Sequence, residues 1–129
     1  MTVLTVSEVI RLHEKLIAKT GGLGGVRDMG LLESAILNCS QTFDGEELYP
    51  AVTDKAAQMA FGICKNHPFL DGNKRAAILS MLMMLRVNGV SLCYTQKELI
   101  DLGLGIAEGT VDDSGILAWI NFHIEARHI

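Results

Sequence analysis

Residues 67–75 bring together five side chains that could do chemistry. They place an imidazole at His67, a carboxylate at Asp71, an amide at Asn73 and two cations at Lys74 and Arg75. A ten-residue apolar run, 76–85, follows at once and predicts a buried helix. A polar cluster at the start of a buried helix is typical of a site mounted on a hydrophobic core.

The two cations indicate what this site could bind. The first turn of a helix already carries partial positive charge, so Lys74 and Arg75 are unfavourable there unless they serve an anion. Phosphate suits them, because arginine offers a planar fork and lysine a point charge. Asp71 would stand beside the phosphates, where a carboxylate typically holds Mg²⁺. His67 could take a proton from a hydroxyl, because imidazole exchanges protons near neutral pH.

A base, a metal ligand and a phosphate clamp are the parts that phosphoryl or nucleotidyl transfer requires. The chain has no G-x-x-x-x-G-K-[ST] sequence, so it would not be a P-loop enzyme. Simpler interpretations make His67 a helix cap, Asp71 the N-cap of the next helix, and the cations solvated surface. A zinc hydrolase built on His13, His67, His123 or His128 fits no known ligand spacing.

Length and composition restrict the class of protein. The 129 residues, 49% hydrophobic and 20% charged, predict one folded domain spanning residues 1–129. The net charge of -4 disfavours broad binding to nucleic acid. The apolar run is about half of the roughly 20 residues that a membrane span needs, and the N-terminus lacks a signal-peptide pattern. Three widely spaced cysteines, Cys39, Cys64 and Cys93, indicate buried thiols in a reducing compartment, so we expect a soluble cytoplasmic protein.

Apolar periodicity predicts an all-α fold of about six helices, with the helix at 73–88 at its centre because its apolar residues point in every direction. The polar segment 41–50 predicts a short flap, either a loop or a hairpin turning at Asp44-Gly45. The glycine-rich segment 21–30 is interpreted as a flexible connector or as the rim of the site. The expected helices cover residues 8–19, 29–39, 55–66, 73–88 and 96–108, and a last one from Asp112 or Asp113 to about Arg127, with Ser7, Asp28 and Asp54 capping the first three.

The stretch from His67 to Arg75 resembles the H-x-F-x-[DN]-[AG]-N-K-R signature of the Fic/Doc family, and more narrowly that of its death-on-curing (Doc) toxins. The resemblance extends to the segments 21–28, 31–35 and 47–50, and in helix order it covers essentially the whole chain. The adenylylating Fic branch has H-P-F-x-[DE]-G-N-G-R-x-x-R instead. Here Lys74 replaces the second glycine and Ile78 the second arginine, so binding of ATP in the adenylylating manner is not expected.

The resemblance implies a Fic/Doc-type helical bundle and a toxin that phosphorylates a hydroxyl on a translation factor with Mg-ATP. In Doc toxins this factor is elongation factor Tu, and protein synthesis stops. By position, His67 would be the general base, Asp71 would hold Mg²⁺ and Phe69 would be a buried anchor. The 41–50 segment would match the flap that aligns the target peptide. The phosphate-binding residues would be Gly72, Asn73, Lys74 and Arg75.

The resemblance also implies an antitoxin, whose C-terminal segment occupies a groove beside the site. An internal [ST]-x-x-x-E-[GN] inhibitory helix is poorly matched here, because Glu108-Gly109 follows Leu104 in place of the hydroxyl residue. Two alternatives remain open: a Fic-type adenylyltransferase that transfers AMP to a protein hydroxyl, and a non-catalytic module that binds a nucleotide or a partner.

Overall fold

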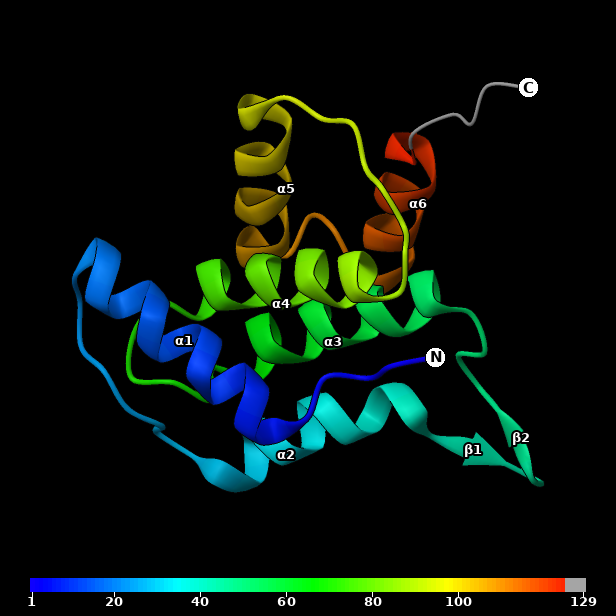
Figure 1. Ribbon diagram of the computed structural model, residues 1–129, viewed down its shortest axis with the longest axis horizontal. Coiled ribbons are helices and arrows are strands. Elements are labelled where there is room, and N and C mark those ends of the chain that lie inside the picture. The colour runs from blue at the N-terminus through cyan, green and yellow to red at the C-terminus, as the bar shows by residue number, and fades with distance from the viewer. Residues whose placement is uncertain (125–129) are drawn as a thin grey trace.

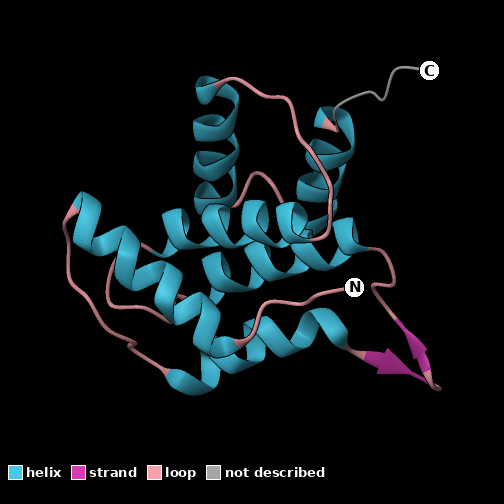
Figure 2. Cartoon of the chain, viewed as in Figure 1, coloured by secondary structure: helices cyan, strands magenta, loops and turns pink. Residues whose placement is uncertain are grey.

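A computed structural model describes residues 1–124 of the chain. In this part the protein is mostly helical, which confirms the predicted all-α fold (Figures 1 and 2). Within residues 1–124 no helix is long and apolar enough to cross a membrane. The elements, in chain order, are α1 (Val6–Thr20), α2 (Met29–Leu37), the 3₁₀ turn η1 (Asn38–Ser40), β1 (Thr42–Phe43), β2 (Glu46–Glu47), α3 (Val52–Asn66), α4 (Asn73–Val87), α5 (Gln96–Glu108) and α6 (Asp113–His123).

Two helices, α3 and α4, lie side by side in the middle of the molecule (Figure 1). The helix α3 packs against α2, α4, α5 and α6, whereas α4 packs mainly against α1, α3 and α5. The central position expected for residues 73–88 is therefore taken chiefly by α3. One side of α4 is only half-buried, at Ile78, Leu79, Leu82 and Met83, so its apolar residues do not all face the core.

The predicted caps of two helices are wrong. Thr5, and not Ser7, is the N-cap of α1: its hydroxyl accepts the Glu8 N–H at 3.2 Å, and Glu8 Oε1 accepts the Thr5 N–H at 2.9 Å. This reciprocal pair is a capping box, which satisfies two N–H groups at once, whereas a cap at residue 7 would satisfy one. Ala51, and not Asp54, is the N-cap of α3, and the Asp54 carboxylate accepts the Ala51 N–H at 3.3 Å from inside the first turn.

Other boundaries agree more closely with prediction. The N-cap Asp28 is confirmed, and α5 covers residues 96–108 as expected. The last helix begins at Asp113, one of the two predicted starts, with Asp112 as its N-cap. The last helix is shorter than predicted, because Ile124 leaves the helix and pairs with Leu92 in an isolated β-bridge. The predicted end at Arg127, and His128, lie outside the described residues. Of the cysteines, Cys39 and Cys64 are buried as expected, but Cys93 is exposed.

An ion pair joins the last two helices. His123 Nε2 on α6 lies 2.9 Å from Glu98 Oε2 on α5, and His123 Nδ1 lies 2.7 Å from the Trp119 carbonyl oxygen. The histidine, together with hydrogen bonds from Thr95, lowers the pKa of Glu98 to about 2. The contact holds α5 and α6 together as a pair standing on α3 and α4 (Figure 1).

The predicted flap is a hairpin. Thr42 pairs with Glu47 and Phe43 with Glu46, and the turn residues Asp44 and Gly45 have φ of 52° and 79°. Positive φ at both positions is the geometry of a tight two-residue hairpin turn, which the Asp-Gly dipeptide favours. The hairpin immediately precedes α3, and the nearly buried Lys55 holds it there through a 2.8 Å contact between its Nζ and Glu47 Oε1.

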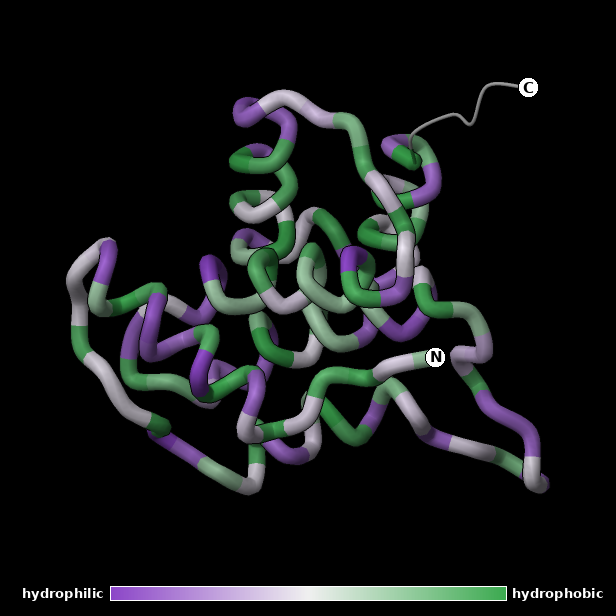
Figure 3. Tube along the Cα trace, viewed as in Figure 1, coloured by the Kyte–Doolittle hydropathy of each residue, from purple (hydrophilic) through white to green (hydrophobic). Residues whose placement is uncertain are grey.

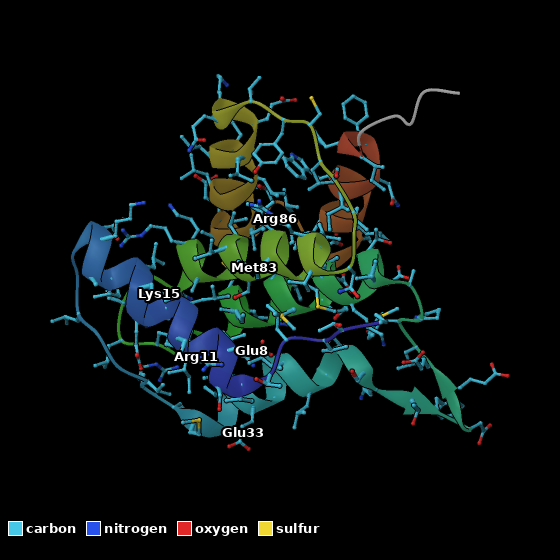
Figure 4. All side chains as sticks on the ribbon, viewed as in Figure 1. Glu8, Arg11, Lys15, Glu33, Met83 and Arg86 are labelled. Carbon is cyan, nitrogen blue, oxygen red and sulfur yellow. The ribbon has the colours of Figure 1, made fainter. Side chains whose placement is uncertain are left out.

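The helix α1 is amphipathic and turns one buried polar side chain inward. Glu8, Arg11 and Lys15 follow its outer side (Figure 4). Val9 and His13 lie on its other side and are buried. The tube in Figure 3 shows the resulting alternation of hydrophilic and hydrophobic residues along α1. A buried histidine in an apolar stripe needs a polar partner, and His13 finds one in the site described below.

We expect Thr5→Ala to lower the free energy of unfolding by about 1 kcal/mol, because it removes the capping box of α1. The matched control is Ser7→Ala, two residues later and also exposed, which should change this free energy by less than about 0.5 kcal/mol. Urea unfolding followed by circular dichroism measures both. Equal effects of the two substitutions would contradict the assignment of Thr5 as the cap.

Candidate active site

The structure brings all six predicted site residues to one cavity, of about 450 Å³, between the end of α3 and the start of α4. The turn that joins these helices forms most of its wall. Leu70 is the one further lining residue. The residues predicted from the sequence are His67, Asp71, Gly72, Asn73, Lys74 and Arg75.

His67 ends α3 in an unusual conformation. Its φ of 48° and ψ of 56° place it in the left-handed region, which costs a non-glycine residue roughly 1–2 kcal/mol. Glycine is the usual residue at such a helix end, so an exposed histidine here indicates that the side chain itself is needed. The Arg27 guanidinium holds the strained end in place by donating to the His67 carbonyl oxygen at 2.7 Å and to that of Asn66 at 3.0 Å.

Asn73 closes the turn. Its Oδ1 accepts the Phe69 N–H at 2.9 Å, and its Nδ2 donates to the Phe69 carbonyl oxygen at 3.0 Å. Both halves of the amide are thus engaged with one backbone residue. One N–H of the Asn73 amide is used by Phe69 and the second has no hydrogen-bond partner among residues 1–124, so the predicted phosphate-binding role of Asn73 stays a prediction. Its contribution to the site is to shape the turn.

Asp71 presents its carboxylate in the cavity with both oxygens hydrogen-bonded to the backbone. Oδ2 accepts the Leu23 N–H at 3.2 Å and Oδ1 accepts the Gly72 N–H at 2.8 Å. These bonds hold the pKa of Asp71 below its ordinary value, so the carboxylate is ionised at neutral pH. Gly22 makes room for it, because a β-carbon at that position would lie 2.6 Å from Asp71 Oδ2.

The start of α4 is the positive side of the cavity. Its N-cap is Gly72, with a φ of 73°, and no side chain caps the first turn. Its first N–H groups therefore have no intrahelical partner. The exposed side chains of Lys74 and Arg75 stand beside them, and within residues 1–124 neither is within 4 Å of a carboxylate. Arg75 is oriented by a 2.8 Å hydrogen bond to Thr20 Oγ1. Unpaired cations at an uncapped helix start are suited to binding an anion.

Two residues outside the predicted site, His13 and Arg27, support the turn. His13 is buried, stacks on the Phe69 ring with centroids 3.8 Å apart, and its Nε2 lies 2.8 Å from the Asp71 carbonyl oxygen. Because a carbonyl only accepts, His13 donates this hydrogen bond. Phe69 is 1% exposed, which confirms it as a buried anchor. The sequence signal for His13 was its place in the apolar stripe of α1, and for Arg27 its place in the glycine-rich segment.

The segment that borders the turn is the glycine-rich loop, and not the hairpin. Val26 and Phe69 form an antiparallel bridge, and the Leu70 N–H donates to the Gly25 carbonyl oxygen at 3.1 Å. The hairpin and His67 lie at opposite ends of α3, a helix of 15 residues and therefore roughly 20 Å long (Figure 1). The expectation that residues 41–50 align a target at His67 is thus corrected: residues 21–28 occupy that position.

The donor set fits Mg²⁺ that is bound together with phosphates. Within residues 1–124 no group of three or more His, Cys, Asp or Glu side chains converges on one point, so the protein offers no complete metal cage. Asp71 alone contributes a carboxylate, and each of its oxygens keeps a lone pair beyond its backbone hydrogen bond. Mg²⁺ commonly binds in this way, through one or two carboxylates, with phosphate oxygens and water completing the octahedron.

The helical bundle and the H-x-F-x-D-G-N-K-R turn, which sets a histidine and an uncapped helix start at one cavity between two central helices, define the class of protein. The sequence profile of the Fic/DOC family matches residues 3–85. Over 89 residues the chain is 37% identical to the Toxin Doc of Mycolicibacterium smegmatis, covering 67% of this chain and 68% of the relative. Over 109 residues it is 35% identical to the Protein kinase doc of Escherichia phage P1, covering 84% and 85%. The chain therefore belongs to the Fic/DOC family.

We expect Asn73→Ala to lower the free energy of unfolding by about 1–3 kcal/mol in the absence of any nucleotide, because the Phe69 N–H and carbonyl groups lose their partners. Asn73→Asp should lower the free energy of unfolding by a similar amount, because the carboxylate can still accept the Phe69 N–H but its other oxygen faces the Phe69 carbonyl oxygen. The control is Lys74→Ala, an adjacent exposed side chain without an ion-pair partner, for which less than about 0.5 kcal/mol is expected. Thermal and urea unfolding measure the stability of each variant. Similar curves for Asn73→Ala and Lys74→Ala would refute the structural role of Asn73.

Proposed function

We propose that this protein is the toxin of a toxin–antitoxin pair, and that it transfers the γ-phosphoryl group of Mg-ATP to a hydroxyl of a target protein. The observation that carries the proposal is the single cavity that holds His67, Asp71, Lys74 and Arg75 at the uncapped start of α4. Membership of the Fic/DOC family supports it, as do relatives named Toxin Doc and Protein kinase doc.

In the proposed reaction the triphosphate lies along the start of α4. Lys74 and Arg75, with the free N–H groups of the first turn, neutralise its oxygens. Mg²⁺, held by Asp71 and the phosphates, supplies further neutralisation when bound. His67 takes the proton of the target hydroxyl as that oxygen forms a bond to the γ-phosphorus. The bond between this phosphorus and the β–γ bridging oxygen breaks, and ADP leaves with its electron pair.

Lys74 is the residue that favours phosphoryl over adenylyl transfer. Adenylylating Fic proteins carry glycine here and arginine at the position of Ile78. In this structure the Lys74 stem lies beside Gly103 of α5, where a β-carbon would be 3.4 Å from Lys74 Cγ. Lys74 also lines the phosphate cavity, where glycine would have no side chain to occupy space. Ile78 brings no charge to hold a further phosphate. Together they support binding of ATP with its γ-phosphate facing His67.

We propose elongation factor Tu as the target, on the strength of the resemblance to Doc toxins. Purified elongation factor Tu is incubated with the protein, Mg²⁺ and ATP labelled on either the γ- or the α-phosphate. Transfer of the γ-label alone is expected, with a mass increase of one phosphate. Removal of Mg²⁺ by a chelator should abolish it. Transfer of the α-label would instead make the protein an adenylyltransferase, and ATP binding without transfer would make it a binding module.

The variant His67→Gly separates catalysis from structure. Transfer should fall by at least about 100-fold, since a general base contributes roughly that much or more. The free energy of unfolding should stay the same or rise by up to about 1 kcal/mol, because glycine relieves the left-handed strain at this helix end. Kinetic assays and urea unfolding of the same preparation test both. A loss of stability with transfer intact would show that His67 is only a cap.

The antitoxin segment has a suitable groove next to the phosphate site. A mostly apolar cavity of about 510 Å³ lies between α1, α4 and α5 and shares Lys74 and Arg75 with the phosphate cavity. We propose that an amphipathic C-terminal segment of the antitoxin docks here. Its apolar residues would meet Leu99 and Ile100 of α5, and a carboxylate would meet the two cations. Docking would cover the phosphate-binding side chains and stop transfer.

We expect Ile100→Asp to weaken binding of this segment by about tenfold or more, because it places a charge in the apolar groove. The matched control is Leu104→Asp, one turn later on α5, exposed and outside the groove. Calorimetry with a peptide from the C-terminus of the protein encoded by the adjacent reading frame measures both. Equal binding by the two variants would place the antitoxin elsewhere.

A further inference from the structure

A second cavity adjoins His67 on the side away from the phosphate clamp. It has a volume of about 310 Å³ and lies between the C-terminal half of α3 and the corner that joins α5 to α6. Its wall is mainly apolar, with one cation and one carboxylate. Lys65 extends over the Phe61 ring, 5.4 Å from its centroid, and Asp112 is engaged as the N-cap of α6. The wall residues that matter below are Phe61, Lys65, Ile106, Ala107, Val111 and Asp112.

His67 is the only residue, among the described part of the chain, that lines both this cavity and the phosphate cavity. The phosphate cavity continues from His67 to Asp71, Lys74 and Arg75, all charged. The second cavity continues from His67 in another direction, toward Phe61 and Ile106. The histidine thus stands at the boundary between a site for anions and an apolar pocket.

Group transfer from a nucleotide needs this kind of boundary. The attacking and leaving oxygens lie roughly in line, on opposite sides of the transferred phosphorus. The base must contact the attacking hydroxyl within hydrogen-bond distance, so the hydroxyl reaches His67 from the side that the phosphates do not occupy. A nucleoside whose γ-phosphate faces His67 extends toward Lys74 and Arg75, and so away from the second cavity.

We propose that the second cavity is the acceptor pocket: it receives an aliphatic side chain of the target protein adjacent to the hydroxyl that is modified. The inference rests on the proposed function, in that His67 is taken as the base. An aliphatic side chain suits the walls, because Phe61, Ile106, Ala107 and Val111 leave few unpaired polar groups. The pocket is adjacent to the base, so filling it orients the hydroxyl for attack.

Ala107 offers a way to fill the pocket from its rim. It is exposed, sits near the end of α5 and lines the cavity without touching the phosphate clamp. We expect Ala107→Trp to raise the KM for the acceptor protein by about tenfold or more, with the KM for Mg-ATP unchanged within twofold. Ala107→Val should have a smaller effect in the same direction. The control Leu104→Trp puts the same ring on the same helix outside the pocket and should change neither constant.

The assay uses the full chain, elongation factor Tu as acceptor and ATP labelled on the γ- or the α-phosphate, with folding of each variant checked by urea unfolding. An unchanged acceptor KM in Ala107→Trp would overturn the pocket. So would an equal rise in the KM for ATP, which would assign the cavity to the nucleoside. Transfer of the α-label alone would refute the kinase function and still test the pocket, because adenylyl transfer needs the same acceptor at His67. No transfer of either label by the unsubstituted protein would overturn both.

Discussion

The two hydrogen bonds between the Asn73 side chain and the Phe69 backbone are the constraint on which the rest of the site depends. They close the turn between α3 and α4, so that a strained helix end and an uncapped helix start face one cavity. An amide is suited to this task because it donates and accepts at one position. Without the closed turn, His67 at the end of α3 and Asp71 in the turn would have no fixed position relative to the start of α4.

Segments that are distant in the sequence hold this closed turn in place. His13 of α1 supports it from the core, through its stacking on Phe69 and its hydrogen bond to Asp71. The loop 21–28 binds its outer edge, and Arg27 holds the end of α3. These contacts offset the strain at His67, which would otherwise favour a different helix end. A buried histidine and a glycine-rich loop thus hold the groups that line the cavity in place.

Three cavities meet at this turn, and the polar residues of the site stand at their boundaries. Lys74 and Arg75 separate the apolar groove of α1, α4 and α5 from the phosphate cavity, and His67 separates the phosphate cavity from the pocket at the α5–α6 corner. The Glu98–His123 pair joins α5 and α6 at their ends away from that corner. Under the proposed function, the antitoxin segment, the nucleotide and the acceptor each occupy a separate cavity. Each cavity is lined by His67, Lys74 or Arg75.

The residues of the site could be read from the sequence because nine consecutive positions carry them, and the spacing from His67 to Arg75 already places them between two helices. The hairpin at Asp44-Gly45 was predictable for the same reason, since its turn chemistry is local. The cap of α1 was misassigned although Thr5 and Glu8 stand in the capping-box spacing. The roles of Arg27 and His13, the position of the hairpin at the far end of α3, and the engagement of Asn73 with Phe69 emerged only from the folded chain. Spacing along a chain governs contacts within one or two turns, whereas contacts across 40 or 58 residues depend on how helices pack.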